Sequence, residues 1–328
     1  MLTRRPALTL FLALGAGAAV RRPARAQAAW RMVTEYPATA MPGEGLAHFA
    51  STMSRLSAGA LAVRPGFDAS EGLRSAGMLR AVAEGRVEAA DAFTGALAGE
   101  APVFGISALP FLTASTADTA RLLQAARPAY RAALAGRGLS LLYATPWPAT
   151  GLWSRQPLPG PEALQGLRVR TYDAAGTAVL RAAGAAPVQI SFADALPRLR
   201  AGELDAVLSS GDGGAGARLW EVLPDFSVLD YASPLSLAFC GADRLAALPE
   251  AARAAVAQAA GETEARQFQA ITSRLAENEA RMRANGVAIA TSPALRAALA
   301  QAAAPVVADW ASRAGAEGEA ILAAYRRG

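Results

Sequence analysis

The sequence contains no lysine, and among its 328 residues it has one cysteine, Cys240, and one histidine, His48. A single cysteine excludes a fold held together by disulfides. With one histidine and one cysteine, the sequence has no cluster of metal-binding side chains with zinc-site spacing. A Ser-His-Asp triad would depend on His48 alone. We interpret His48 as a packing or surface residue, and Cys240, in the apolar run LSLAFC, as a buried and inert thiol. The sequence therefore predicts no catalytic residue, no metal and no cofactor.

The net charge of +5 is confined to the N-terminus. All 32 basic residues are arginine, and five of them stand in the first 28 residues, which hold no Asp or Glu. The other 27 arginines face 27 acidic residues, so the rest of the chain lacks the basic excess that nucleic-acid binding requires. A hydrophobic content of 53% with 18% charged residues also excludes a disordered chain.

The first 28 residues have the pattern of a secretory signal peptide. Arg4 and Arg5 precede an apolar run over 6–20, and the sequence Ala26-Gln27-Ala28 matches a signal-peptidase site. We expect a mature protein that begins near Ala29 and resides in the periplasm. The arginine pair leaves Tat export open beside the Sec route.

Beyond the signal peptide, two similar β-α-β-α-β units predict an α/β protein of two lobes, each a sheet flanked by helices. The first unit has expected strands at 30–36, 61–65 and 87–93 and helices at 46–56 and 72–84; the second has strands at 167–171, 187–190 and 204–209 and helices at 174–183 and 192–200. A helix over 249–285 is too long for one small domain, so we expect both lobes to share it. A last helix is expected at about 293–325.

The run GDGGAG at Gly211–Gly216 fits the G-x-G-x-x-G pattern of dinucleotide-binding folds. It follows an expected strand and precedes an expected helix over 217–223, and Asp230 follows 14 residues after the last glycine. The short helix and the late place of the motif in its unit favour a glycine-rich turn near a small ligand. A Tat-exported oxidoreductase that binds a nucleotide at Gly211–Gly216 remains the alternative.

Several segments together resemble the DctP-like solute-binding proteins of TRAP transporters, the tripartite ATP-independent periplasmic systems. The most specific are LQGLRVR (164–170) and AAPVQISFADALPRLRAGELDAV (185–207); AVAEGRVEAAD (81–91) and PVFGISALPFL (102–112) are weaker. The resemblance implies two lobes around a cleft, with 29–148 plus about 236–275 in the first and 149–235 plus about 276–328 in the second. It also implies a small organic acid as ligand, small and large TRAP membrane subunits as partners, and a monomer. A binding protein of the ABC type is a further reading, which the LRVR motif and the long helix disfavour.

The resemblance places a carboxylate-binding arginine at Arg170, and the chemistry of the residue supports it. Arg170 stands at the carboxyl end of an expected strand, where open α/β sheets bind ligands, and a guanidinium offers a carboxylate two parallel donors. Arg168, on the same strand, is expected to be solvated. Further cleft candidates stand at strand ends and in the loops that follow them: Glu35, Tyr36, Phe93, Thr94, Trp147, Trp153, Gln189, Phe192, Ser209, Ser210 and Asp212.

Two departures from the family pattern bear on the ligand. TGLWS (150–154) stands where many members carry another arginine, and LSSGDG (208–213) stands where many carry Asn or Glu. Both argue against the usual C4-dicarboxylate and sialic-acid ligands and against a cation. One anchoring arginine among several aromatic residues predicts a monocarboxylate.

Overall fold

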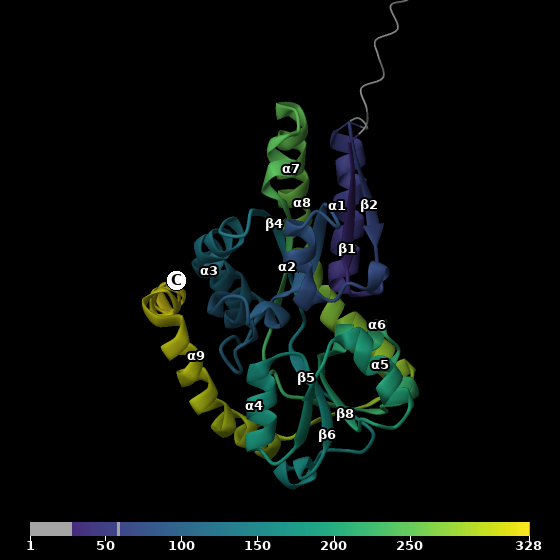
Figure 1. The fold of residues 1–328 in the computed structure, drawn as a ribbon. Helices are drawn as coiled ribbons and strands as arrows, with labels where there is room; N and C mark the ends of the chain where they lie inside the picture. The colour runs from purple at the N-terminus through teal and green to yellow at the C-terminus, as the bar shows by residue number, and fades with distance from the viewer. Residues whose placement is uncertain (1–27, 58–59, 328) are drawn as a thin grey trace, which may run out of the picture.

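The computed structural model describes residues 28–57 and 60–327. The predicted signal peptide lies outside these residues except for Ala28, which opens the first strand. Two mixed sheets with flanking helices form two lobes, one above the other in Figure 1. Among the described residues, no helix combines the length and the apolar character that crossing a membrane requires.

The first lobe is built on a five-stranded sheet with the order β2-β1-β3-β10-β4. Its strands are β1 (Ala28–Thr34), β2 (Leu61–Gly66), β3 (Ala89–Phe93), β4 (Leu139–Pro146) and β10 (Leu235–Gly241). Its helices are α1 (Met41–Leu56), α2 (Ser75–Ala83), α3 (Thr116–Ala135) and α7 (Ala242–Ala246), with 3-10 turns at Ser70–Gly72, Thr94–Leu97 and Pro102–Ala108. β1, β2 and β3 run parallel as predicted, whereas β10 enters antiparallel between β3 and β4.

The second lobe is built on a six-stranded sheet with the order β11-β9-β5-β8-β6-β7. Its strands are β5 (Thr150–Ser154), β6 (Arg168–Thr171), β7 (Ala186–Gln189), β8 (Ala206–Ser210), β9 (Asp225–Val228) and β11 (Ala288–Thr291). Its helices are α4 (Ala174–Ala182), α5 (Phe192–Arg200) and α6 (Gly211–Gly216), with 3-10 turns at Pro161–Leu164 and Leu219–Glu221. β6 pairs in parallel with β7 and β8, which confirms the second predicted unit, and β5 joins antiparallel.

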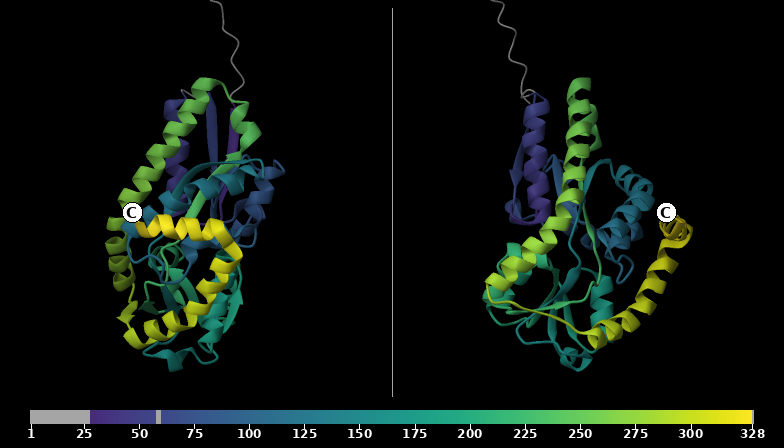
Figure 2. Two further views of the ribbon diagram at one scale, coloured as in Figure 1. Left: turned by 90° about the vertical axis from the view of Figure 1, so that its left-hand side faces the viewer. Right: turned by 180° about the vertical axis from the view of Figure 1, so that it is seen from behind.

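Two long helices connect the lobes (Figure 2). α8 (Glu250–Ala284) packs its N-terminal half, including Val256, in the first lobe and its last turn, at Met282, in the core of the second. α9 (Pro293–Arg327) begins in the second lobe and curves back, so that Trp310 and Ile321 pack in the first. The division expected from the sequence places all of 276–328 in the second lobe, whereas the end of α9 packs in the first lobe.

Element ends differ from the predictions at two places that bear on the site. β1 ends at Thr34, so Glu35 and Tyr36 follow the strand and belong to the loop at its carboxyl end. The glycine run is not a turn before a helix: it is itself the short helix α6, because Ser210 caps it, and only a 3-10 turn occurs within 217–223.

Candidate functional site

A pocket lies between the two lobes at the carboxyl ends of several strands. The space between its lining atoms, counted together with the solvent at its opening, is about 330 Å³. The first lobe and the two crossing segments supply Tyr36, Phe93, Trp147 and Pro234; the second lobe supplies Thr150, Arg170, Tyr172, Phe192, Ser209, Ser210 and Gly213. Seven of the residues proposed from the sequence therefore meet in one place.

Arg170 is the one cationic side chain among the described residues that line this pocket, and it is 4% exposed. Its Nε donates to the carbonyl of Ile190 at 2.9 Å and its Nη1 to that of Leu208 at 3.3 Å. Those two bonds orient the guanidinium, and within the described residues Nη2 makes no hydrogen bond. Burial lowers the pKa of Arg170, while Tyr36 and Glu35 act in the opposite direction. An arginine remains protonated in proteins, so the pocket holds a fixed positive charge.

Aromatic rings from both lobes form the walls. Tyr36 meets Trp147 edge to face at 4.6 Å between ring centroids and Phe192 at 6.1 Å, and Phe93 meets Tyr172 at 5.0 Å. The indole of Trp147 is fixed because its Nε1 donates to the Ser236 hydroxyl at 3.0 Å. These rings exclude water and offer flat apolar faces to a ligand.

Hydroxyl groups complete the pocket. The Tyr172 hydroxyl is buried beside Thr150 and has no hydrogen-bond partner of ordinary geometry among the described residues, and burial raises its pKa, so the phenol keeps its proton as a donor. Ser210 accepts from Gly213 N at 3.1 Å and so caps α6. An anion held by Arg170 can thus meet neutral polar groups as well as apolar walls.

Glu35 and Gln189 line an adjoining opening rather than the pocket itself. This opening also borders Arg170, Tyr36 and Phe93, which places it at the mouth of the site. The Glu35 carboxylate is 4% exposed and is engaged by backbone: it accepts from Ser75 N at 2.9 Å, from Phe192 N at 2.8 Å and from Ala193 N at 3.3 Å.

Two candidates, Thr94 and Trp153, point away from the pocket. Thr94 turns into the first lobe, where its hydroxyl donates to the Leu235 carbonyl at 2.8 Å. Trp153 is completely buried, packs against Phe226 and donates to the Ser210 carbonyl at 3.1 Å. Because Trp153 lies three residues beyond Thr150, it faces the other side of β5.

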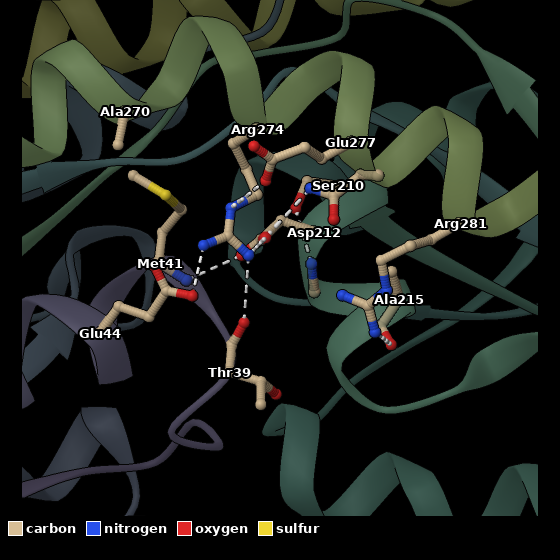
Figure 3. A network of polar contacts seen from close by, with 12 residues as sticks. Thr39, Met41, Glu44, Ser210, Asp212, Ala215, Ala270, Arg274, Glu277 and Arg281 are labelled. Carbon is tan, nitrogen blue, oxygen red and sulfur yellow. Dashed lines mark hydrogen bonds and ion pairs between the residues drawn. The ribbon is translucent and has the colours of Figure 1, made fainter.

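The third misplaced candidate, Asp212, belongs to a network where both lobes meet α8 (Figure 3). Its carboxylate accepts from Met41 N of the first lobe at 2.8 Å and from Asn278 Nδ2 of α8 at 3.0 Å. Arg274 of α8 lies 3.5 Å from Asp212 and also pairs with Glu44 of α1. Asp212 is therefore a structural link between the lobes.

Four pocket residues were not predicted from the sequence: Thr150, Tyr172, Gly213 and Pro234. Tyr172 could have been predicted, since it lies two residues after Arg170 and so faces the same side of the chain. Thr150 and Pro234 lie on the two segments that cross between the lobes, which run side by side: Trp147 N donates to the Pro234 carbonyl at 2.9 Å. That pairing is not visible from either segment alone.

The remaining chemically reactive side chains lie elsewhere. His48 Nδ1 is 3.1 Å from the Thr263 hydroxyl between α1 and α8, and burial lowers its pKa. Cys240 is buried, which raises the pKa of its thiol to about 12. No group of three or more His, Cys, Asp or Glu that could hold a metal occurs within residues 28–57 and 60–327.

Two lobes joined by crossing segments, with a charged and aromatic pocket between them, define a solute-binding protein. Residues 32–313 match the family described as "Bacterial extracellular solute-binding protein, family 7", also called DctP, and the chain belongs to this family. It is an extracytoplasmic solute receptor of the TRAP type, and receptors of this type work with membrane subunits. The alternative of a nucleotide-dependent oxidoreductase finds no support.

Solved structures agree with the assignment. The solute receptor DctP7 of Bordetella pertussis, described as binding pyroglutamic acid, is 28% identical with a TM-score of 0.88 over 91% of this chain and 99% of that one. A TRAP solute-binding protein from a marine metagenome, described as specific for pyroglutamate, is 29% identical with a TM-score of 0.88 over 92% and 100%. A glucuronate-bound TRAP protein from Roseobacter denitrificans, at 20% identity and a TM-score of 0.82 over 90% and 99%, shares the fold. A comparison with curated protein sequences gives no match.

Proposed function

We propose that this receptor binds a small monocarboxylate of the pyroglutamate type and has no catalytic role of its own. The observation that carries the proposal is the single buried guanidinium of Arg170, whose Nη2 is available to a carboxylate at the end of a small aromatic pocket. The two relatives near 28–29% identity described as binding pyroglutamate support the same ligand class.

The composition of the pocket favours one negative charge on the ligand. Arg170 is the only cation among the described lining residues, and the Glu35 carboxylate at the mouth lies close enough to influence its pKa. A second ligand carboxylate would be desolvated without a partner, which is costly in a buried site. The ring amide of pyroglutamate instead matches hydroxyls such as those of Tyr172 and Ser209, and its methylene groups match the aromatic walls.

We also propose which parts of the chain form each lobe. The first lobe comprises 29–148, about 236–275 and the end of α9 around Trp310 and Ile321, and the second comprises 149–235 and the rest of about 276–328. The segments near Trp147–Ala149 and Ala232–Leu237 and helix α8 form the hinge. The paired crossing segments, held by Thr150 N to the Ala232 carbonyl at 2.8 Å, support this placement.

The test is calorimetric titration with L-pyroglutamate, after a thermal-shift screen of small carboxylic acids. Arg170→Ala should weaken binding about 30-fold to several thousand-fold, because it removes one partner of a buried charged pair. Arg170→Lys should recover only part of the affinity, since it keeps the charge but loses the paired donors.

Arg168→Ala is the matched control. Arg168 lies two residues away on β6, and its guanidinium forms a half-exposed pair with Asp205 at 2.5 Å. We expect its loss to change binding by less than about five-fold. Unchanged affinity in Arg170→Ala, with circular dichroism showing a folded protein, would refute carboxylate anchoring at this residue.

A further inference from the structure

Glu35 lies at the mouth of the site, yet its hydrogen bonds go to backbone groups of both lobes. Oε2 accepts from Ser75 N at the start of α2 in the first lobe. Oε1 accepts from Phe192 N and Ala193 N at the start of α5 in the second lobe. One side chain of the first lobe thus completes the N-terminus of a helix in the second.

The N-terminus of α5 shows how much it depends on Glu35. A helix begins with backbone N–H groups that have no partner within the helix. In α5, Ser191 accepts from Asp194 N at 3.0 Å, and Glu35 accepts from the two preceding N–H groups. A negative charge is also favourable at this end of the helix dipole. If the lobes separate, these groups lose their partner and Glu35 loses its contacts with α5.

A second contact between the lobes lies beside the first. Arg74, which precedes α2, donates to Asp194 Oδ1 of α5 from Nε at 3.1 Å and from Nη2 at 2.7 Å. Both side chains are partly exposed, at 33% and 50%, so this pair contributes less than the buried Glu35 contacts. This ion pair lies on the solvent side of the Glu35 contacts and joins the same two helix ends.

The consequence for the pocket follows from Phe192. Its ring forms part of the wall and lies 5.5 Å from the Arg170 guanidinium, while its backbone N–H is held by Glu35. We propose that Glu35 is a positioning residue, an interlobe clasp that holds α5 and Phe192 over the bound ligand and sets the rate at which the ligand leaves. It does not recognise the ligand directly. This inference rests on the proposed function only for the identity of the probe.

The kinetic test uses Glu35→Gln with L-pyroglutamate in stopped-flow measurements. Glutamine has the same shape, but its amide nitrogen cannot accept, so it loses either the contact with Ser75 N or the two contacts with Phe192 N and Ala193 N, and the contacts that remain lose the carboxylate charge. The dissociation rate should rise about ten- to a hundred-fold while the association rate changes less than about three-fold. Glu203→Gln, which alters an exposed carboxylate paired with Arg198 in the second lobe, should leave both rates unchanged.

A ligand analogue separates a clasp from direct recognition. 5-Oxotetrahydrofuran-2-carboxylate has a ring oxygen in place of the N–H of pyroglutamate. If Glu35 accepted that N–H, Glu35→Gln would change the ratio of the two affinities. A clasp predicts an unchanged ratio and faster dissociation of both ligands.

A distance measurement tests the clasp without relying on binding. Spin labels at Ala83→Cys, at the end of α2, and Ala201→Cys, just after α5, report the opening of the mouth, and the native Cys240 is buried and escapes labelling. Glu35→Gln should lengthen the mean distance relative to the unsubstituted labelled protein, with or without L-pyroglutamate. If wild type does not bind pyroglutamate but the distance still lengthens, the proposed ligand is wrong and the clasp stands. If neither distance nor dissociation rate changes, the clasp is overturned.

Discussion

Asp91 is one of several buried carboxyl groups among the described residues. It lies in β3, is completely buried, and neither carboxyl oxygen has a hydrogen-bond partner of ordinary geometry in the described part of the chain. Burial, offset in part by the Ser236 hydroxyl, raises its pKa to about 8. Because the unfolded chain releases this proton near pH 4 and the folded protein holds it, stability falls as pH rises from about 4 to about 8.

We expect Asp91→Asn to remove this dependence on pH. The difference in unfolding free energy between Asp91→Asn and wild type should be about 4 kcal/mol larger at pH 8 than at pH 5, since each pKa unit is about 1.4 kcal/mol. Urea denaturation at both pH values measures it. A constant difference between the two proteins would show that Asp91 is ionised in the folded state.

At the scale of single residues, the sequence predicted where strands end, but it did not predict the direction in which each side chain points. The rule that ligands bind at carboxyl ends of strands found Arg170 and Tyr36, both of which line the pocket. It also selected Thr94 and Asp212, whose side chains bind backbone groups of distant segments. Partners so remote in sequence are set by tertiary packing, which leaves no local pattern.

At the scale of elements, the glycines of α6 have a packing role. A β-carbon on Gly214 would lie 2.2 Å from the Trp153 ring, whereas one on Gly216 would meet nothing closer than 3.6 Å. The close approach of α6 to Trp153 therefore depends on Gly214. The match to a nucleotide-binding pattern is a coincidence of composition.

Gly214→Ala should destabilise the protein by about 1–3 kcal/mol, because the added methyl group forces α6 away from a completely buried ring. Gly216→Ala, in the same helix, should change stability by less than about 1 kcal/mol. Thermal unfolding of both variants makes the comparison. Equal losses of stability in the two variants would mean that the geometry of α6, and not the contact with Trp153, requires glycine at position 214.

The long helix and the two parallel units were the most predictable elements. The predicted helix over 249–285 matches α8 (Glu250–Ala284). The run of helix-forming residues contains no proline and no two adjacent glycines that would interrupt it. The antiparallel entries of β5 and β10 were not predicted. Neither strand has a hairpin partner next to it in the sequence, so only the assembled sheets determine their places.

At the scale of the molecule, two lobes around one pocket predict closure on ligand. Small-angle scattering should give a smaller radius of gyration with saturating L-pyroglutamate than without it, at the mass of one chain. Glu35→Gln should reduce the difference. Equal radii with and without bound ligand would exclude a hinge motion.

The place of β10 also bears on how the chain reaches this structure. β10 lies in the middle of the first sheet, between β3 and β4, yet it is translated only after β5 to β9 of the second lobe. Until residues 235–241 emerge from the ribosome, β3 and β4 have no strand between them and the first lobe cannot complete its core. Pairings so distant in sequence slow folding, because a long loop must close before they form. The nascent chain should therefore remain open and accessible to chaperones for most of its synthesis, and a fragment that stops before Leu235 should fail to protect the backbone amides of β3 from hydrogen exchange.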